Sequence, residues 1–431
     1  MPTTVTAVVA GCGNRGLYVY ALYAKEHPER MRIVACADLL PERVNMMKND
    51  HNIPPSHCFS SAEEMFQRPK IADVAFICTQ DRDHVRHASA AIEKGYDLLL
   101  EKPISPDLSE CKRLLRLAES RGRRVTVCHV LRYTPFYQTL KRLIESGAVG
   151  EVVQINAAEN VGYWHQAHSF VRGHWRNSKE TSPMILAKSC HDMDILLWLS
   201  GKTCTRVSSF GGNYLFRAEK APDGAALRCL DGCECKDRCV FDAEKIYLTN
   251  PGTGYLRAPD NWMAKTVCDH PTEAGIRQAL QDGPYGRCVY HCDNDVVDHQ
   301  QVALDMEDGS TIGFSMCAFS ETCYRTIHIM GTRGEINGNI DTEKITVERF
   351  DQEPEMIDLS VEETIGGHGG GDTLLMDSLA DLESGVASTN CALTSLDQSI
   401  ASHYAALAAE ESRIQGGKSI SLEDFIARIP D

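Results

Sequence analysis

The sequence predicts a two-domain α/β protein that begins with a doubly wound parallel sheet. The chain has 431 residues, which is too long for one ordinary hydrophobic core. Its first 130 residues alternate short apolar runs with amphipathic stretches, the pattern of strands and crossover helices. A complete G-x-G-x-x-G follows the first apolar run, which is where a dinucleotide-binding sheet has its glycine turn.

The first strand, the glycine turn and the following helix form one predicted unit. Val5–Ala10 is a β-branched apolar run that suits a buried strand, and Leu17–Ala24 has apolar residues at helical spacing. Gly11 permits a tight turn, Gly13 lets the backbone approach phosphates, and Gly16 lets helix and strand pack closely. The residues of this turn that we expect at the cofactor are Gly11, Gly13, Asn14, Arg15 and Gly16.

An acidic residue after the second predicted strand supports a cofactor site. The apolar run Arg32–Ala37 ends at Asp38, 22 positions after Gly16, near the spacing of the carboxylate that binds the adenosine ribose. A carboxylate there repels the 2′-phosphate of NADP, so the sequence favours NAD over NADP. The alternative is a glycine turn that only connects a strand to a helix, and the acid at this spacing disfavours it.

The remaining elements of the first domain continue the alternation. The predicted helices are Pro41–Asp50, Ser61–Phe66, Asp83–Lys94 and Ser109–Ser120, and the predicted strands are Ala72–Cys78, Asp97–Leu100 and Arg124–His129. Strands that alternate with helices imply a parallel sheet with ligands beyond the carboxyl ends of its strands. The other residues that we expect at this cofactor edge are Thr79, Gln80, His84, Glu101, Lys102, His129 and Arg132.

The tripeptide Glu101-Lys102-Pro103 directly follows a predicted strand. A lysine in this place can lie beside the nicotinamide, and the proline fixes the backbone next to it. A cis peptide bond before the proline would fix the direction in which the lysine side chain points. The alternative is a solvated lysine at a strand end, and for the tripeptide alone that is the simpler interpretation.

Together these motifs resemble those of the Gfo/Idh/MocA family of oxidoreductases. The residues that carry the resemblance are Gly11–Gly16, Asp38, Glu101-Lys102-Pro103, Arg132-Tyr133, Pro135 and Leu140–Val152. The resemblance is close over about the first 152 residues and looser afterwards. It implies a glycine turn that binds NAD or NADP, and a lysine that touches both the nicotinamide ribose and the substrate.

The same resemblance implies how the chain is divided. We expect an NAD-binding Rossmann domain over residues 1–130, followed by a substrate-binding and oligomerisation domain over residues 131–431. The second domain would be α+β, with an open, mostly antiparallel sheet. One part of that sheet carries the substrate site in the family, and its exposed face commonly forms an oligomer interface, which implies a homodimer or homotetramer.

The second domain begins with a predicted strand, Glu151–Ala158, and continues with a segment dense in rings and guanidinium groups, Glu159–Asn177. Aromatic faces suit stacking against a sugar ring, and Arg and His suit its hydroxyls or an acidic group. One alternative is an aromatic loop that packs on the sheet with its histidines hydrogen-bonded inside, and another is metal binding by these histidines, which no H-x-x-x-H or acid spacing supports. The residues of this segment that we expect at the substrate are Tyr163, His165, Arg172 and Trp175.

A predicted helix, Ser182–Ser200, carries Lys188, His191 and Asp194 three residues apart, so the three share one face. Asp194 could orient the imidazole, and all three are candidate substrate residues. The family commonly has D-x-x-x-H-x-x-D here, with the histidine as proton acceptor. This chain has Ala187 in place of the first aspartate, so Lys188 could fill that space as a donor. The alternative for His191 is a satisfied core histidine.

A long insertion over about residues 212–298 contains a cysteine cluster with the spacing C-x3-C-x-C-x3-C. Four thiolates at Cys229, Cys233, Cys235 and Cys239 could surround one structural Zn²⁺. The spacing is not that of a standard zinc finger or ribbon, so free thiols are the alternative.

The last third of the chain predicts further strands and two helices. The turn at Asp308-Gly309 within the alternating run Gln301–Ala318 predicts a hairpin. The glycine-rich loop Gly366–Asp372 can approach a ligand closely, which makes His368 a candidate substrate residue, and the alternative is a flexible turn. The other expected elements are the strands Thr326–Gly331 and Lys344–Phe350 and the helices Thr373–Ser384 and Ser395–Gln415.

Composition limits the partners and the compartment. The formal net charge of -16 argues against nucleic acid or an anionic membrane, because no basic field would attract either. No apolar stretch approaches the length needed to span a membrane, and the first apolar run is a strand rather than a signal peptide. We therefore expect a cytoplasmic protein whose 18 cysteines are mostly reduced thiols.

These observations predict an NAD-dependent oxidoreductase that moves a hydride between nicotinamide and a ring CH–OH of a sugar, cyclitol or sugar derivative. His191 would take the hydroxyl proton, and Lys102 would hold the hydroxyl and steady the growing carbonyl dipole. Three alternatives remain. They are a glycosidase in which bound NAD oxidises the sugar transiently, an enzyme for a non-sugar carbonyl, and a sensor that binds NAD or sugar without turnover.

Overall fold

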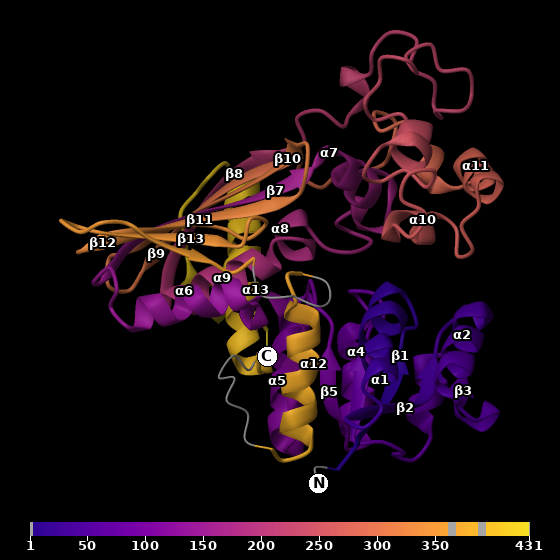
Figure 1. Ribbon diagram of the computed structural model, residues 1–431, viewed down its shortest axis with the longest axis horizontal. Coiled ribbons are helices and arrows are strands. Elements are labelled where there is room, and N and C mark those ends of the chain that lie inside the picture. The colour runs from indigo at the N-terminus through magenta and orange to yellow at the C-terminus, as the bar shows by residue number, and fades with distance from the viewer. Residues whose placement is uncertain (1–2, 361–367, 387–393, 431) are drawn as a thin grey trace.

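The computed structural model describes residues 3–360, 368–386 and 394–430. These residues form two β-sheets with helices packed against them, and a lobe of mostly irregular chain that rises beside the second sheet (Figure 1). The first sheet belongs to the N-terminal part of the chain and the second to the C-terminal part. This arrangement confirms the predicted fold class.

The first sheet has six parallel strands in the order β3-β2-β1-β4-β5-β6, the order of a dinucleotide-binding Rossmann fold. Its strands are short and apolar because helices cover both faces: Val5 and Val9 of β1 point into one core, and Val8 and Ala10 into the other. The strands are β1 Val5–Ala10, β2 Met31–Ala37, β3 Cys58–Phe59, β4 Val74–Ile77, β5 Asp97–Leu100 and β6 Val125–Val127.

The helices of this domain follow the prediction closely. The helix after the glycine turn is π-helical over Gly16–Ala21 and continues as α1, Leu22–Glu26. The other helices are α2 Pro41–His51, α3 Ala62–Gln67, α4 His84–Glu93 and α5 Leu108–Arg121, and a 3-10 turn follows β6 at Val130–Tyr133. Strand β3 was not predicted, because two residues are too few to show a period.

The second sheet has nine strands in the order β14-β13-β12-β11-β7-β10-β9-β8-β15. Within the described part of this second sheet only the β7–β10 pair is parallel, so the expected open, mostly antiparallel sheet is confirmed. The strands are β7 Val152–Gly162, β8 Cys204–Gly212, β9 His299–Met306, β10 Thr311–Ser320, β11 Tyr324–Gly331, β12 Gly334–Asn339, β13 Lys344–Arg349, β14 Glu355–Asp358 and β15 Ile420–Ser421.

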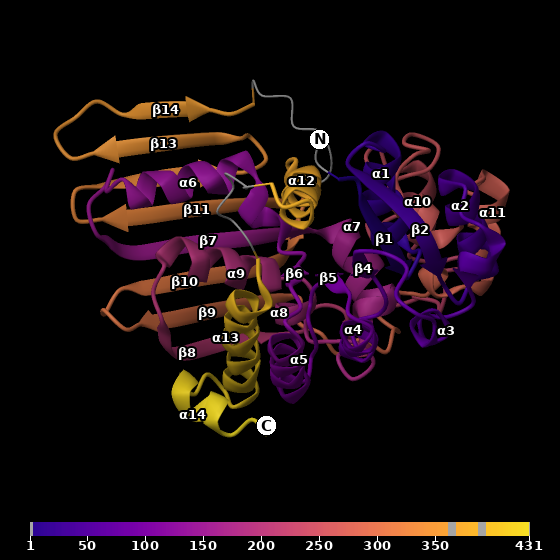
Figure 2. The ribbon, with the colours of Figure 1, turned by 90° about the horizontal axis from the view of Figure 1, so that it is seen from below.

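One face of the second sheet is covered by helices α6 Pro135–Glu145, α9 Cys190–Ser200 and α13 Leu396–Ile414, which lie in front of its strands in Figure 2. Burial along β9 alternates residue by residue, which shows that the opposite face stays open. Helix α14, Leu422–Ala427, follows the short edge strand β15. The sequence prediction missed α6, β8, β12, β14, β15 and α14, and β12 (GEINGN) has too few apolar residues to show a strand pattern.

The predicted helix Ser182–Ser200 is two helices, α8 Met184–Ala187 and α9. The chain leaves helical geometry at Ser189, between them. The predicted aromatic loop is also more regular than expected: β7 extends to Gly162, and helical turns follow over Tyr163–Arg172, the first of them α7, Tyr163–His165.

Helix α12, Gly371–Glu383, follows the second sheet in the chain but packs on the first domain. Its residues Leu375, Met376 and Leu379 belong to the core that contains Val9 and Phe76. Helix α12 thus covers one face of the first sheet together with the helix after the glycine turn. The other face receives the beginning of α13.

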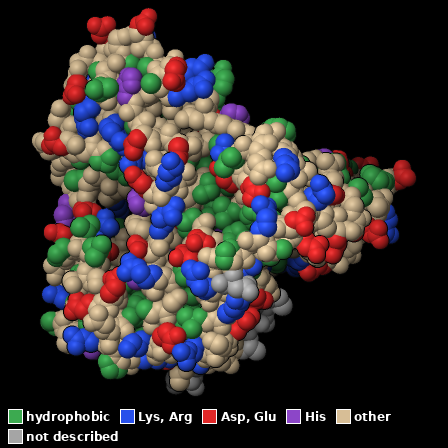
Figure 3. Space-filling model, turned by 180° about the vertical axis from the view of Figure 1, so that it is seen from behind, with side chains coloured by type: hydrophobic (Ala, Val, Ile, Leu, Met, Phe, Trp, Pro, Cys, Tyr) green, Lys and Arg blue, Asp and Glu red, His purple; other side chains and the backbone are tan. Residues whose placement is uncertain are grey.

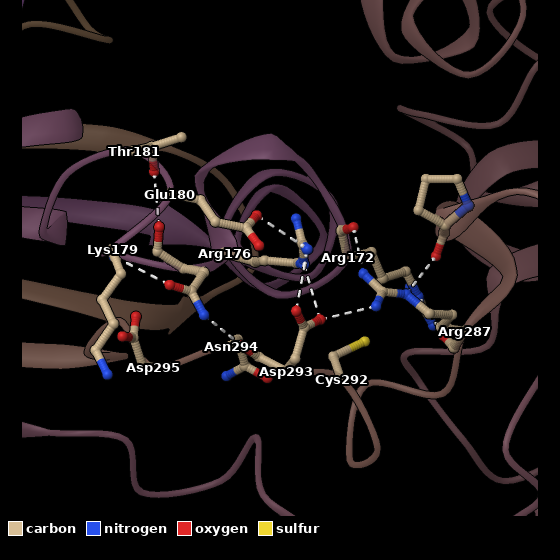
Figure 4. A network of polar contacts seen from close by, with 12 residues as sticks. Arg172, Arg176, Lys179, Glu180, Thr181, Arg287, Cys292, Asp293, Asn294 and Asp295 are labelled. Atoms are coloured by element: carbon tan, nitrogen blue, oxygen red, sulfur yellow. Dashed lines mark hydrogen bonds and ion pairs between the residues drawn. The ribbon is translucent and has the colours of Figure 1, made fainter. Parts of the chain in front are cut away.

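The insertion lies between the paired strands β8 and β9 and has a small core of its own that includes Phe216, Tyr247 and Leu280. Its helices are α10 Trp262–Val267 and α11 Glu273–Asp282. Figure 4 shows how it is attached: Arg176 of the second domain and Arg287 of the insertion both point at the carboxylate of Asp293, each at 2.8 Å.

The surface is charged but mixed. On the face shown in Figure 3, acidic and basic side chains are interspersed over the described residues, with no broad basic area. Over residues 3–360, 368–386 and 394–430, we find no helix with the length and apolar character to cross a bilayer.

Candidate active site

A cavity of about 710 Å³ lies where the two domains and the insertion meet. It begins at the glycine turn and extends toward the second sheet. Its lining includes Asn14, Arg15, Glu101 and Lys102 from the first domain, Lys188, His191, Arg325 and His368 from the second, and Trp262 from the insertion.

The glycine turn fits a dinucleotide pyrophosphate. Gly11 has a φ of +94°, and a Cβ there would lie 2.4 Å from the carbonyl oxygen of Cys78. A Cβ at Gly16 would lie 2.0 Å from the carbonyl oxygen of Gly11. At Gly13, by contrast, the nearest atom to a Cβ would be Nη1 of Arg43 at 3.8 Å, so the backbone there is open to a phosphate.

Asp38 lies at the end of β2, directly beside this turn. Its Oδ2 accepts a hydrogen bond from the backbone N–H of Cys12 at 2.7 Å, and its Oδ1 accepts one from Leu40 at 2.9 Å. These bonds fix the carboxylate, which stays half-buried. Its remaining lone pairs can accept hydrogen bonds from the ribose hydroxyls of a dinucleotide.

The residues after β4 divide into two groups. Thr79 and Gln80 are accessible at the cofactor edge of the sheet, as expected. His84 is not, because it is buried and its ring nitrogens lie 2.7 Å from the carbonyl oxygen of Pro103 and 3.0 Å from that of Thr79. The structure thus does not bring the ring of His84 to the cofactor edge, and the ring links the loops that contain Thr79 and Pro103.

His129, Arg132 and Asp194 lie behind the cavity rather than in it. Burial lowers the pKa of His129 to about 4. Arg132 forms a buried two-point ion pair with Asp194, Nε–Oδ2 at 2.7 Å and Nη2–Oδ1 at 2.6 Å. Asp194 is therefore not free to bind substrate or to orient His191. The structure does not bring these three predicted residues to the cavity, and for Arg132 and Asp194 the reason is that a buried guanidinium needs a counter-charge.

Arg15 points inward from the glycine turn and pairs with two carboxylates. Its Nε lies 2.6 Å from Glu101 Oε1, and its Nη2 lies 2.6 Å from Asp372 Oδ1. The hydroxyl of Tyr20 donates to Glu101 at 2.5 Å. Burial alone would raise the pKa of Glu101, but Arg15, Lys102 and this hydrogen bond outweigh burial and lower it. Glu101 is thus a fixed anion next to Lys102.

Lys102 reaches from the first domain to the second. The Lys102–Pro103 peptide bond is cis. The ammonium group donates to the carbonyl oxygen of Ala187 at 3.1 Å, at the end of α8. Where the family commonly has an aspartate, this chain therefore offers Lys102 a backbone carbonyl.

His191 is near the start of α9 and faces the same cavity as Lys102. Burial, followed by Lys102 and His368, lowers the pKa of this imidazole well below its ordinary value. Its Nδ1 has no hydrogen-bond partner in the described part of the chain. A neutral imidazole with an unpartnered ring nitrogen can accept a proton.

Lys188 belongs to a buried charge network that the sequence did not reveal. Its Nζ lies 3.1 Å from Oε1 of Glu159, whose Oε2 lies 2.6 Å from Nε of Arg325. The same Nε lies 2.7 Å from Oδ1 of Asp192. Burial raises the pKa of Asp192 to about 6, against the pull of Arg325. Lys188 and Arg325 both line the cavity, and the carboxylates of Glu159 and Asp192 balance their positive charges.

Aromatic rings form one wall of the cavity. The rings of Trp164 and His165 are stacked, with centroids 5.6 Å apart, and Trp262 meets His165 edge-on at 5.5 Å. Trp175 also lines the cavity, so two of the four residues predicted in this segment lie there. Trp262 was not predicted, since a lone tryptophan in an irregular insertion gives no signal.

Tyr163 and Arg172, which were predicted at the substrate, face the insertion and do not line the cavity. The hydroxyl of Tyr163 accepts from Nδ2 of Asn250 at 3.0 Å. Arg172 is fully buried and donates to the carbonyl oxygens of Arg287 and Phe241, both at 2.7 Å. Both side chains hold the insertion to the second domain.

The cysteine cluster surrounds a small cavity of about 10 Å³. Its thiols come from Cys229, Cys233, Cys235, Cys239 and Cys288. Over the ranges that the structure describes, no three Cys, His, Asp or Glu side chains are arranged to hold a metal ion. The structural zinc site therefore stays a prediction from spacing, which metal analysis of the purified protein would test.

His368 lines the cavity from the loop before α12. Gly366 and Gly367, which belong to the predicted glycine-rich loop, lie outside the described residues. The following glycines have positive φ values, +60° at Gly369 and +81° at Gly370, which explains why the loop needs glycine.

This fold and site define a nicotinamide-dependent oxidoreductase with a separate substrate domain, because a dinucleotide turn, a lysine and a histidine meet at one cavity. Comparison with family models agrees. The oxidoreductase family model with an NAD-binding Rossmann fold matches residues 5–129, and its C-terminal alpha/beta domain matches residues 141–416. The chain belongs to the Gfo/Idh/MocA family of oxidoreductases.

Relatives of this chain include named oxidoreductases and dehydrogenases. It is 24% identical over 365 residues to a Bacillus subtilis protein named as an oxidoreductase, YteT, covering 81% of this chain and 79% of that one. It is 25% identical to inositol 2-dehydrogenase of Corynebacterium glutamicum, over 57% of this chain and 68% of that one. The structure of levoglucosan dehydrogenase with NADH and levoglucosan has the same fold, with a TM-score of 0.68 and 16% identity over 97% of this chain and 99% of that one.

Proposed function

We propose that this protein is an NAD-dependent dehydrogenase that oxidises a ring CH–OH group of a sugar, cyclitol or sugar derivative. The observation that carries the proposal is the meeting of Lys102 and His191 at one cavity that adjoins the glycine turn. The names of two relatives, an inositol dehydrogenase and a levoglucosan dehydrogenase, support this class of substrate. Asp38 beside the turn supports NAD rather than NADP.

The chemistry follows from the positions of the two groups. When bound, NAD supplies the hydride acceptor, C4 of its nicotinamide ring. Lys102, held by the carbonyl oxygen of Ala187, donates to the substrate hydroxyl and stabilises the oxygen as the carbonyl forms. His191 accepts the hydroxyl proton, since it is neutral in the resting site.

The walls of the cavity suit a polyhydroxylated ring. The indoles of Trp164, Trp175 and Trp262 offer apolar faces for C–H groups. On another side, Lys188 and Arg325 offer donors to hydroxyls or to an acidic group. Because Glu159 partners both cations, they are held in place before a ligand arrives.

The experiment is a measurement of NADH absorbance and glycoside cleavage on the same samples. Purified protein is given NAD with free sugars, cyclitols and aryl glycosides. We expect net NADH from at least one free sugar or cyclitol, and a loss of about 100-fold or more in Lys102→Ala and His191→Ala. The exposed Lys94→Ala variant is the matched control and keeps full activity.

Each alternative outcome points to a different function. Cleavage of an aryl glycoside without net NADH would move the function to redox-assisted hydrolysis. Binding of NAD and sugar without either reaction would indicate a sensor. Activity that survives both substitutions would mean that the chemistry lies on other residues.

We also infer a homodimer or homotetramer that forms through the uncovered face of the second sheet. That face has a shallow groove of about 530 Å³ across β7, β11, β12 and β13, lined by small and polar side chains such as Ala158, Thr326 and Asn337. Such side chains allow two sheets to approach closely. Light scattering coupled to size-exclusion chromatography would measure the oligomer, and Thr326→Arg would be expected to weaken it.

A further inference from the structure

The loop before α12 brings a second imidazole to the cavity, next to a buried carboxylate. Nδ1 of His368 lies 3.0 Å from Oδ2 of Asp372. The φ of His368 is +53°, a left-handed conformation that residues other than glycine adopt rarely and often at functional sites. The other ring nitrogen, Nε2, is the one left for the cavity side, because Nδ1 is engaged by the carboxylate.

Asp372 is held in place from several directions. It lies in the first turn of α12 and is 3% exposed. Arg15 contacts both of its oxygens, at 2.6 and 3.3 Å. Burial alone would raise the pKa of Asp372, but Arg15 and the hydrogen bond with His368 outweigh burial and hold it well below its ordinary value. A Cβ at Gly371 would lie 2.4 Å from the carbonyl oxygen of Val130, so the start of α12 is pressed against the first domain.

His191 has no comparable support for a positive charge. Its Nδ1 is unpartnered in the described residues, and Asp194 is occupied by another partner. A proton on His191 would create a buried cation near Lys102. A proton on His368 would instead sit on a ring that donates to Asp372, a charge-assisted hydrogen bond.

The two imidazoles are close enough to act in sequence. Their ring centroids are 5.8 Å apart, and both line the cavity. His368 is also more open to solvent, with 39% of its side chain exposed against a buried His191. A proton that His191 accepts can therefore move to His368, where its charge is better stabilised and closer to solvent.

We propose that His368, positioned by Asp372, is the terminal proton acceptor of this site: it receives the hydroxyl proton of the substrate by way of His191 and releases it to water. This inference rests on the proposed dehydrogenase function. The carbon–hydrogen bond breaks as hydride leaves for the nicotinamide, the O–H bond breaks, and the C=O bond forms. The released proton reaches Nε2 of His368 while its Nδ1–H donates to Asp372. Carbonyl reduction runs the same path backwards.

Several charged groups share this part of the cavity. The charged groups that line the cavity are Arg15 on the glycine turn, Glu101 and Lys102 after β5, Lys188 after α8, Arg325 on β11, Asp341 and Glu343 between β12 and β13, and Asp372 on α12. Three imidazoles line the cavity, those of His165, His191 and His368, and among the described residues His368 is the one of these three that pairs with a carboxylate. A change in the pH profile that is confined to His368 variants therefore reports on the dyad.

The kinetic test compares His368→Ala and Asp372→Asn with the wild type on a substrate found by the NADH assay. We expect kcat of His368→Ala near neutral pH to fall about 100-fold, with KM within about threefold. Added imidazole should restore part of kcat, and the solvent deuterium isotope effect should rise because proton transfer becomes slow. His27→Ala, which removes a surface imidazole near Glu29, is the matched control and leaves kcat unchanged.

A second measurement needs no substrate. Long-range ¹H–¹⁵N spectra report which nitrogen of the His368 ring carries the proton. We expect Nδ1–H in the wild type and a shift toward Nε2–H in Asp372→Asn, because the carboxylate that selects the tautomer is gone. This variant also keeps the shape of the buried side chain, so it tests the dyad where a truncation at Asp372 could unfold the helix start.

The outcomes separate the dyad from the proposed function. A His368→Ala variant with kcat within about threefold of the wild type and the same pH profile would overturn the proposal. So would a loss that imidazole does not restore and that leaves the isotope effect unchanged, since that indicates a structural role. A wild type that binds NAD but oxidises nothing would overturn both, and the spectra would then show whether the His368–Asp372 pair exists.

Discussion

The ion pair between Arg132 and Asp194 can be tested by removing its partners singly and together. The structure assigns both side chains to the protein interior, where they are 4% and 1% exposed. Among the described residues, Asp194→Leu leaves the guanidinium buried without a counter-charge, and Arg132→Met leaves the carboxylate with Nε2 of His129 at 3.9 Å as its one basic neighbour. The double variant replaces the pair by two apolar side chains of similar size.

The size of the effect follows from the contact. At 2.6 Å and an effective dielectric constant of about 20, the attraction is about 6 kcal/mol, part of which is offset by desolvation of both ions. Removing one partner of such a pair costs about 3–5 kcal/mol, because the other charge stays buried. The double variant should recover most of this loss and lie within about 2 kcal/mol of the wild type.

The assay is urea unfolding followed by tryptophan fluorescence, combined with kcat for each folded variant. Asp194→Leu should unfold at a clearly lower urea concentration, and the double variant should keep kcat within about fivefold of the wild type. If Asp194→Leu lowers the free energy of unfolding by less than about 1 kcal/mol, the account of a buried ion pair is refuted. A stable double variant with a kcat about 100-fold lower would indicate that Asp194 takes part in catalysis.

Three further predictions concern the cofactor turn, the acid beside the lysine, and the insertion. Asp38→Asn keeps an acceptor for the N–H of Cys12 but loses the charge, so the preference for NAD over NADP in kcat/KM should fall about 10-fold; an unchanged ratio would contradict the role of Asp38. The folded protein lowers the pKa of Glu101, so this carboxylate stabilises the fold above its unfolded pKa and the stabilisation is lost as pH falls through the folded value. The free energy of unfolding, measured from pH 3 to 7, should therefore decline more steeply below about pH 5 in the wild type than in Glu101→Gln, and parallel curves would oppose this account. Trp262→Ala should raise KM about 10-fold with kcat within threefold, because Trp262 lines the cavity from the insertion, and an unchanged KM would separate the insertion from substrate binding.

Local patterns were sufficient to predict most of the first domain. Val5–Ala10 and Asp97–Leu100 were predicted with the bounds that the structure has, because buried parallel strands are short apolar runs between polar turns. The place of Lys102 at the end of a strand follows from the same pattern. The cis peptide bond before Pro103 was anticipated as a possibility and is present.

The candidate site was predicted less completely, because side-chain partners come from distant parts of the chain. Helical spacing places His191 and Asp194 on one face but says nothing about Arg132, which comes from another element and takes the carboxylate. Arg172 has the composition of a ligand-binding residue, yet its guanidinium is used to fasten the insertion. Arg325 is a lone cation in a strand and gives no local signal at all.

Helix α12 has a consequence for how the protein is made. The core beneath the glycine turn is closed by Leu375 and Met376, although the strands of that core are complete by residue 127. At about 5–20 residues per second, a ribosome needs roughly 12–50 seconds to travel from the end of the first domain to this helix. During that time the nascent first domain exposes an apolar face, and Arg15 and Glu101 lack the carboxylate of Asp372 that completes their network. Truncating the chain before residue 371 should therefore destabilise the first domain, because Leu375 and Met376 would be missing from its core.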